Sequence, residues 1–206
     1  LNQGAVFTNA HYEHFPTVTA IGHSTFFSGA TPSISGIPGN TWYDRELGKS
    51  VTSVSDPETD LIGIKGQAAG ASPRKLLVST LPDELKMSGK GGKSFGISMK
   101  DRSAILPAGH MADGAFWFDP DEGMFVTSTY YMKQLPSWVA EYNALREGER
   151  FLKEQWKTWD GKVLPPAGGK SVEKPLLVLE YTPFANEMIE ALAERAIEAE
   201  KLGQGD

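Results

Sequence analysis

The chain has 206 residues, of which 40% are hydrophobic and 22% are charged, a composition that suits one globular domain or a large part of one. Its formal net charge is −6, so it lacks the excess of basic residues with which a nucleic-acid surface neutralises phosphates, and we expect no nucleic-acid partner. No apolar run approaches the roughly 18 residues of a membrane span, and the absence of cysteine excludes disulfides and thiolate metal sites.

The first informative stretch runs from residue 16 to residue 44. The β-branched run Thr17-Val18-Thr19 precedes a short helical pattern that ends at Gly29, with Pro32 beyond it. This places Thr19 near a helix N-terminus, where free N–H groups and the helix dipole favour a phosphoryl group beside its hydroxyl. The alternative is that Thr19 only caps the helix. Thr17 faces the same way in an extended run, so direction alone does not choose between the two hydroxyls.

The next segment, residues 45–73, is rich in glycine, serine and aspartate, and we expect surface loops there. A helical pattern follows, with Ser79 or Thr80 as the cap and acidic residues in the first turn. Residues 95–99 have the composition of a buried strand. The helix and the strand together predict half of a βαβ unit.

A second polar cluster, Lys100-Asp101-Arg102, follows this strand directly. In an extended segment Lys100 and Arg102 point to the same side and Asp101 points to the other. The pattern therefore predicts a face that carries two positive charges. The alternative is a solvated charge cluster at the end of a strand.

The remaining chain alternates aromatic-rich segments with helical ones. Residues 116–119 and 124–131 predict a hairpin, and a helix is expected to open at Pro136, to be interrupted at Gly148 and to resume to Trp159. Residues 176–181 have the composition of a strand. A helix is expected from Thr182 to about Leu202, with one apolar face.

Two of these stretches resemble one known family. The run Thr19-x-x-Gly-His and the later Asn40, twenty-one positions after Thr19, are similar to the nucleophile segment of the alkaline phosphatase superfamily. The match is nearest to the phosphate-irrepressible alkaline phosphatases and more distant to the nucleotide pyrophosphatase/phosphodiesterases. The string from Lys100 to His110, Lys-Asp-Arg-Ser-Ala-Ile-Leu-Pro-Ala-Gly-His, resembles the phosphatase segment that supplies a lysine and an arginine to the substrate phosphate.

The resemblance implies an α/β fold with a parallel-sheet core and an inserted cap. Residues 1–112 would be part of the catalytic core, residues 113–175 the cap, and residues 176–206 a strand and helix that return to the core. The metal ligands of the family would lie mostly before Leu1 and after Asp206. We therefore expect the N-terminal to middle portion of such an enzyme, periplasmic or secreted, without membrane contact, and inactive by itself.

The implied activity is hydrolysis of small-molecule phosphate monoesters at a site with two zinc ions. Thr19 would be both the catalytic nucleophile, forming a phosphothreonine intermediate, and a metal ligand. Asn40, Lys100 and Arg102 would bind the substrate phosphate. A phosphodiesterase or nucleotide pyrophosphatase is the second candidate, although a second ester group would occupy the space of the two cations. A non-catalytic anion-binding or interaction module is the third.

Overall fold

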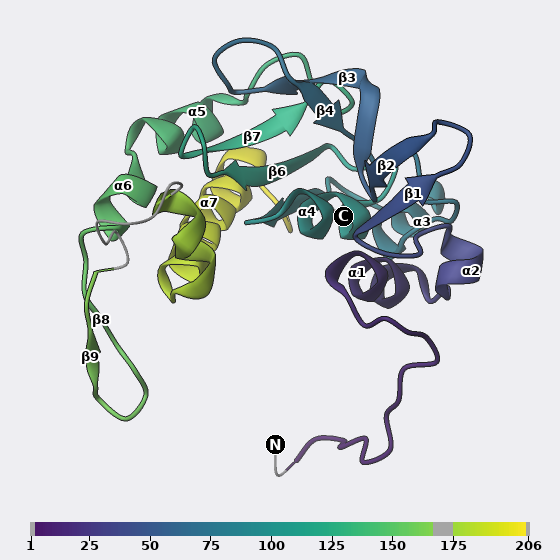
Figure 1. The fold of residues 1–206 in the computed structure, drawn as a ribbon, viewed down its shortest axis with the longest axis horizontal. Helices are drawn as coiled ribbons and strands as arrows, with labels where there is room; N and C mark the ends of the chain where they lie inside the picture. The colour runs from purple at the N-terminus through teal and green to yellow at the C-terminus, as the bar shows by residue number, and fades with distance from the viewer. Residues whose placement is uncertain (1–2, 167–174, 205–206) are drawn as a thin grey trace.

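The computed structural model describes residues 3–166 and 175–204, and its centre is a five-stranded sheet (Figure 1). The strand order is β4-β3-β7-β6-β5. These strands are β3 (Ser55–Ile62), β4 (Ala69–Ala71), β5 (Phe95–Ser98), β6 (Gly114–Asp119) and β7 (Met124–Ser128). Within this sheet β5 and β6 pair in parallel, while β3 with β4, β3 with β7, and β6 with β7 are antiparallel. The expected α/β class holds, but the described sheet is mixed rather than parallel.

The connections explain this mixture. The turn at residues 120–123 is too short for a crossover, so β6 and β7 form an antiparallel hairpin, as the aromatic pattern predicted. In contrast, helix α4 (Asp101–Ala108) joins β5 to β6 and allows them to run in parallel. The hairpin falls in the segment expected to be a cap, and here it continues the sheet of β5. The division into core and cap stays a prediction.

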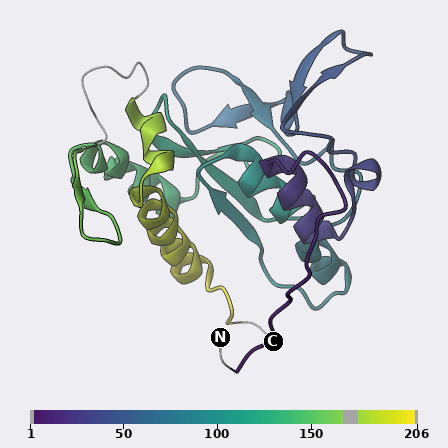
Figure 2. The same cartoon turned by 60° about the horizontal axis from the view of Figure 1, so that its bottom comes forward.

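Helices cover both faces of this sheet. Phe116 and Phe118 of β6 pack in one hydrophobic cluster with helices α5 (Ser137–Ala144) and α7 (Phe184–Glu200). Ala115 and Trp117, which alternate with them, pack in a second cluster with α4 and helix α1 (Thr19–Ser28). Figure 2 shows α7 and α1 on opposite sides of the sheet. The two predicted site segments, at the starts of α1 and α4, therefore share one face.

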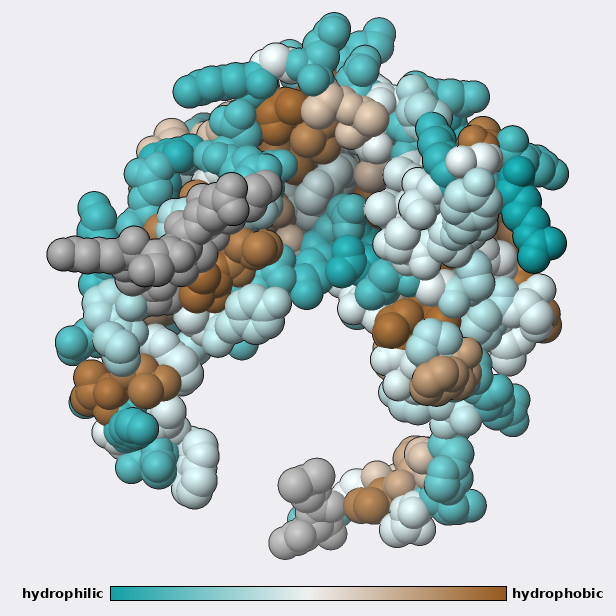
Figure 3. All heavy atoms as spheres, in the orientation of Figure 1, coloured by the Kyte–Doolittle hydropathy of each residue, from teal (hydrophilic) through white to brown (hydrophobic). Residues whose placement is uncertain are grey.

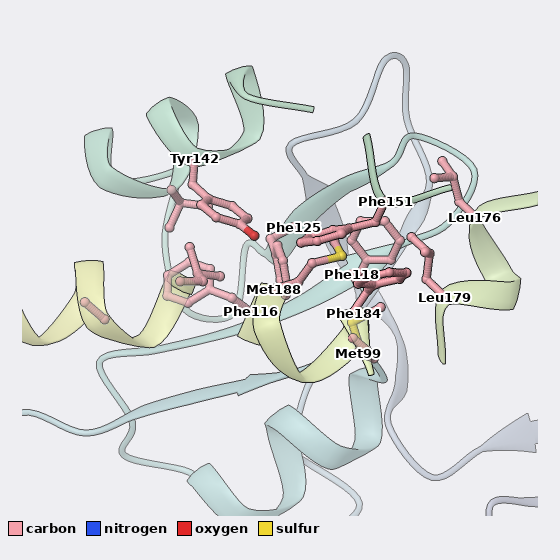
Figure 4. Close-up of a cluster of buried hydrophobic side chains, with 14 of the residues drawn as sticks. Met99, Phe116, Phe118, Phe125, Tyr142, Phe151, Leu176, Leu179, Phe184 and Met188 are labelled. Atoms are coloured by element: carbon pink, nitrogen blue, oxygen red, sulfur yellow. The ribbon is translucent and has the colours of Figure 1, made fainter. Parts of the chain in front are cut away.

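The first hydrophobic cluster, to which α7 contributes, is built mainly from aromatic, leucine and methionine side chains (Figure 4). Leu176 and Leu179 belong to it, but residues 175–181 form a 3₁₀-helix, η1 (Pro175–Tyr181), and not the expected strand. A strand would turn residues three apart to opposite faces, whereas a 3₁₀-helix has three residues per turn and buries both leucines on one side. The predicted strand is therefore wrong, because the apolar residues follow the three-residue period of a 3₁₀-helix.

The helical region after α5 differs from the prediction in where it breaks. Arg146 adopts a left-handed conformation with φ 52° and separates α5 from α6 (Glu147–Phe151). Gly148 lies inside α6, where a Cβ atom would come within 3.1 Å of Leu176, so this glycine serves close packing rather than interruption. The helix does not resume to Trp159. Instead β8 (Trp156–Lys157) pairs with β9 (Val163–Leu164).

The segment expected to be surface loops contains strands. A separate two-stranded sheet is formed by β1 (Thr41–Asp44) and β2 (Lys49–Thr52), and β3 and β4 follow it in the central sheet. A short helix, α2 (Pro32–Ser35), precedes them. Within the described ranges, no helix is long and apolar enough to cross a membrane.

Helix α3 (Leu81–Met87) has the N-terminus that the sequence predicted. Thr80 is its cap, and the buried carboxylate of Asp83 accepts hydrogen bonds from the Thr80 N–H at 2.9 Å and from the Thr80 hydroxyl at 3.1 Å. The other oxygen of Asp83 accepts from the Met111 N–H at 2.7 Å, which joins α3 to the loop after α4. One carboxylate therefore satisfies three donors from two segments.

We expect Asp83→Ala to lower the free energy of unfolding by about 3 kcal/mol, because three buried or half-buried donors lose a charged acceptor. Urea unfolding followed by circular dichroism measures this. The neighbouring Glu84→Ala, which removes an exposed acid from the same turn, should cost under about 1 kcal/mol. Equal losses in the two variants would contradict the structural role of Asp83.

Candidate active site

Thr19 is the first residue of α1, which agrees with its predicted position near a helix N-terminus. The preceding Val18 has an extended backbone and occupies the cap position, and its own side chain makes no capping hydrogen bond. Thr19 is thus not the cap residue, so the alternative that Thr19 only caps the helix does not hold. The helix ends where expected, at Gly29, which has φ 70°. The N–H groups at the start of α1 are available to an anion except where a side chain occupies them.

The side chain of Asn40 occupies one of the free N–H groups at the start of α1. Its Oδ1 accepts a hydrogen bond from the Ala20 N–H at 2.8 Å, and its own backbone oxygen accepts one from the Ser53 N–H at 3.0 Å. The backbone bond fixes the loop, and the side-chain bond fixes the amide orientation, because an N–H donor requires the amide oxygen. Asn40 Nδ2 makes no hydrogen bond to the described residues, so its donors remain for a second acceptor.

Thr19 lines an open cleft of about 660 Å³ along the exposed side of α1. Thr17, His23, Phe26 and Tyr12 also contribute to its walls. Thr17 is exposed in the non-helical segment before α1, whereas Thr19 is half-buried at the helix start. The space-filling view has a broad hollow between α7 and α1, with hydrophilic surface at its top over α4 (Figure 3).

Lys100 and Arg102 do not lie on an extended strand end, which corrects the expectation that both point to one side. Lys100 is the cap residue of α4, and Arg102 is the second residue of that helix. The segment is helical because Asp101 is favourable in a first turn and because Ala104, Ile105, Leu106 and Ala108 are buried. Lys100 Nζ lies 3.0 Å from Glu180 Oε2, and Arg102 Nη1 lies 3.3 Å from Asp101 Oδ1.

Both cations line a second cleft of about 380 Å³, next to Trp117 and Asp119, and not the cleft of Thr19. The structure thus brings Thr19 and Asn40 together and brings Lys100 and Arg102 together. These two pairs lie at the N-termini of α1 and α4, which pack against each other.

His23 lines the Thr19 cleft and is influenced by the charge of Arg102, although sequence reasoning gave it no role. It lies one turn after Thr19 on the same side of α1 and lines both the Thr19 cleft and a pocket bounded by α4 and β5. Burial, and secondly the charge of Arg102, lower the pKa of His23 below its ordinary value of 6.5. The imidazole is therefore mostly neutral at pH 7. The four-residue spacing from Thr19 was the signal that could have singled it out.

Arg102 has an unused donor. Its Nε is buried and has no hydrogen-bond partner among the residues that the structure describes. A buried guanidinium N–H without an acceptor is costly, and an anionic oxygen is the acceptor that suits it best. This donor gives the start of α4 a second feature that fits an anion.

The described parts of the chain do not make a zinc site by themselves. Residues 3–166 and 175–204 contain no group of three or more histidine, aspartate or glutamate side chains that could hold a metal ion. Of the expected ligand set, Thr19 is the one residue that this chain was predicted to supply.

The sequence profile of the family described as type I phosphodiesterase / nucleotide pyrophosphatase matches residues 1–195. The chain belongs to this family. Its curated relatives include alkaline phosphatase PafA of Elizabethkingia meningoseptica, 39% identical over 232 residues, and alkaline phosphatase PhoV of Synechococcus elongatus, 37% identical over 228 residues. These place this phosphodiesterase-family chain in the alkaline phosphatase superfamily, as the two motifs predicted.

A crystal structure of wild-type PafA superposes on this phosphodiesterase-family chain with a TM-score of 0.81 at 38% sequence identity. The match covers 96% of this chain but 43% of the PafA chain, and the two curated relatives are each covered to 42% of their length. The chain thus spans less than half of the proteins it resembles.

Proposed function

We propose that this chain is the part of a phosphate monoester hydrolase that carries the nucleophile, Thr19, and three phosphate-binding side chains, Asn40, Lys100 and Arg102. The observation that carries the proposal is the hydrogen bond from the Ala20 N–H to Asn40 Oδ1. It holds the Asn40 amide at the helix N-terminus that begins with Thr19, and the Nδ2 donors of this amide have no partner among the described residues. This arrangement suits a phosphoryl group.

The chemistry asked of these residues is in-line phosphoryl transfer. The Thr19 Oγ1 forms a bond to phosphorus while the bond from phosphorus to the ester oxygen breaks, and the leaving oxygen keeps the electron pair and takes a proton from water. The Thr19 proton passes to solvent. Water then attacks the phosphothreonine and releases inorganic phosphate and the free hydroxyl.

The three other side chains stabilise charge on the phosphoryl oxygens. Asn40 donates through Nδ2, and Lys100 and Arg102 supply positive charge, with the buried Nε of Arg102 as a donor that still lacks an acceptor. The proposal includes the two zinc ions that the resemblance implies, bound mostly by residues outside this chain. His23, neutral at pH 7, adds no charge beside Arg102.

A second solved relative supports the choice of Thr19, Asn40, Lys100 and Arg102 as the residues of the site. It is a PafA variant in which a threonine, an asparagine, a lysine and an arginine are replaced together, and it superposes with a TM-score of 0.83. The replaced threonine and asparagine are as far apart in that sequence as Thr19 and Asn40 are here. The replaced lysine and arginine are two apart, as Lys100 and Arg102 are.

Trapping the intermediate tests the proposal. We expect that rapid acid quenching of the complete, zinc-loaded enzyme during turnover of p-nitrophenyl phosphate yields a phosphopeptide modified at Thr19, because phosphothreonine survives acid. Peptide mapping by mass spectrometry locates the group. Phosphate on Thr17 or Ser24 would assign the nucleophile to that residue instead of Thr19. The absence of any phosphopeptide would favour direct attack on phosphorus by water.

A further inference from the structure

Glu180 is a carboxylate that the proposed mechanism does not use, and it contacts one of the proposed phosphate-binding residues. Its Oε2 lies 3.0 Å from Lys100 Nζ. Glu180 comes from η1, far along the chain from the start of α4, and both side chains line the second cleft. The pair therefore depends on how η1 packs.

Of the two side chains, the carboxylate of Glu180 is the more buried. The Glu180 side chain is 14% exposed, whereas that of Lys100 is 37% exposed. The backbone of η1 is anchored by Leu176 and Leu179 in the core cluster beneath α7. Lysine carries its charge on a flexible four-carbon stem, and ordering that stem costs conformational entropy.

We propose that Glu180 is a positioning residue that holds the Lys100 ammonium in place for the phosphoryl group. The inference rests on the proposed function, in which Lys100 binds substrate. An ammonium has three N–H donors, so one bond to Glu180 leaves two for phosphoryl oxygens. A carboxylate also repels a phosphate dianion, but water reaches this pair and screens that repulsion, whereas the entropy saved by ordering Lys100 is not screened.

The test compares Glu180→Ala and Glu180→Gln in the complete, zinc-loaded enzyme. Glu180→Ala should lower kcat/KM for p-nitrophenyl phosphate about tenfold and should weaken binding of inorganic phosphate, measured by titration calorimetry, by a similar factor. Glu180→Gln keeps an oxygen that accepts from Lys100, so its loss should be smaller. Hydrolysis of bis-p-nitrophenyl phosphate should change less than about twofold, because a diester has one anionic oxygen fewer to place on the cation.

Two controls separate positioning from a general structural role. Glu190→Ala removes an exposed acid from α7 and should leave both substrates unaffected. In a Lys100→Ala background, Glu180→Ala should cause no further loss, because the residue that it positions is already gone. The midpoint of thermal unfolding of Glu180→Ala should fall by no more than about 4 °C, since a partly exposed ion pair contributes little stability.

The outcomes are distinct. Tighter phosphate binding in Glu180→Ala would mean that the carboxylate competes with substrate, and a loss that persists in the Lys100→Ala background would mean a structural role; either result overturns the inference alone. If Lys100→Ala itself left monoester hydrolysis unchanged, the phosphate-binding role of Lys100 would fail, and the role of Glu180 would fail with it.

Discussion

Replacing Thr19 by alanine in the complete, metal-loaded enzyme is expected to reduce monoester turnover at least about a thousandfold, because no other hydroxyl holds its place at the start of α1. The fold should persist, since the side chain is half-buried and its hydroxyl makes no hydrogen bond to the residues that the structure describes. Initial rates with p-nitrophenyl phosphate measure the loss, and circular dichroism checks the fold. Thr19→Ser should retain measurable activity, because a primary hydroxyl can also attack phosphorus.

Thr17→Ala is the matched control for this experiment. It removes the same atoms from the wall of the same cleft, two residues earlier, but from the exposed segment before the helix. We expect its turnover to stay within about threefold of the unmodified enzyme. A collapse of activity in Thr17→Ala with survival in Thr19→Ala would reverse the assignment of the nucleophile.

The second large effect is expected when Lys100 and Arg102 are both replaced by alanine. A monoester dianion presents one more anionic oxygen than a diester, and each charged contact contributes about 2–4 kcal/mol when it strengthens in the transition state. Monoesterase kcat/KM should fall about a thousandfold and diesterase kcat/KM by about tenfold or less. Parallel measurements with p-nitrophenyl phosphate and bis-p-nitrophenyl phosphate give the change in preference.

Removing two positive charges elsewhere provides the comparison. The double variant Lys65→Ala and Lys90→Ala alters the net charge of the chain equally but changes exposed side chains away from both clefts. It should affect the two substrates by similar, small factors. Equal losses on both substrates in the Lys100 and Arg102 variant would instead indicate that the pair supports the structure or binds a group common to the two esters.

Sequence reasoning succeeded where a local rule decides the structure. Gly29 ends α1 because a left-handed residue is needed there, and the Thr80 capping box starts α3 because two donors and two acceptors match within four residues. The β6–β7 hairpin follows from aromatic runs separated by a short turn. The motifs also sufficed to identify the family, because the two matching strings are long and unusual.

The failures concern features that depend on distant segments. The start of α4 was interpreted as extended because it directly follows the predicted strand at residues 95–99, whereas burial of its apolar residues against β6 and α1 makes it a helix. The contact of Lys100 with Glu180 could not be predicted, because it requires η1 to pack as a 3₁₀-helix under α7. A single sequence gives no signal for a pair so far apart.

The buried carboxylate of Asp83 has one more consequence for the molecule. Because it accepts from the backbone of Thr80 and of Met111, the first turn of α3 cannot fray without also releasing the loop that ends the α4 crossover. Segments that share a buried acceptor belong to one cooperative unit of local unfolding. The amide hydrogens of Thr80 and Met111 therefore belong to one opening event and exchange with solvent together, although a helix, a strand and a second helix separate them in the sequence.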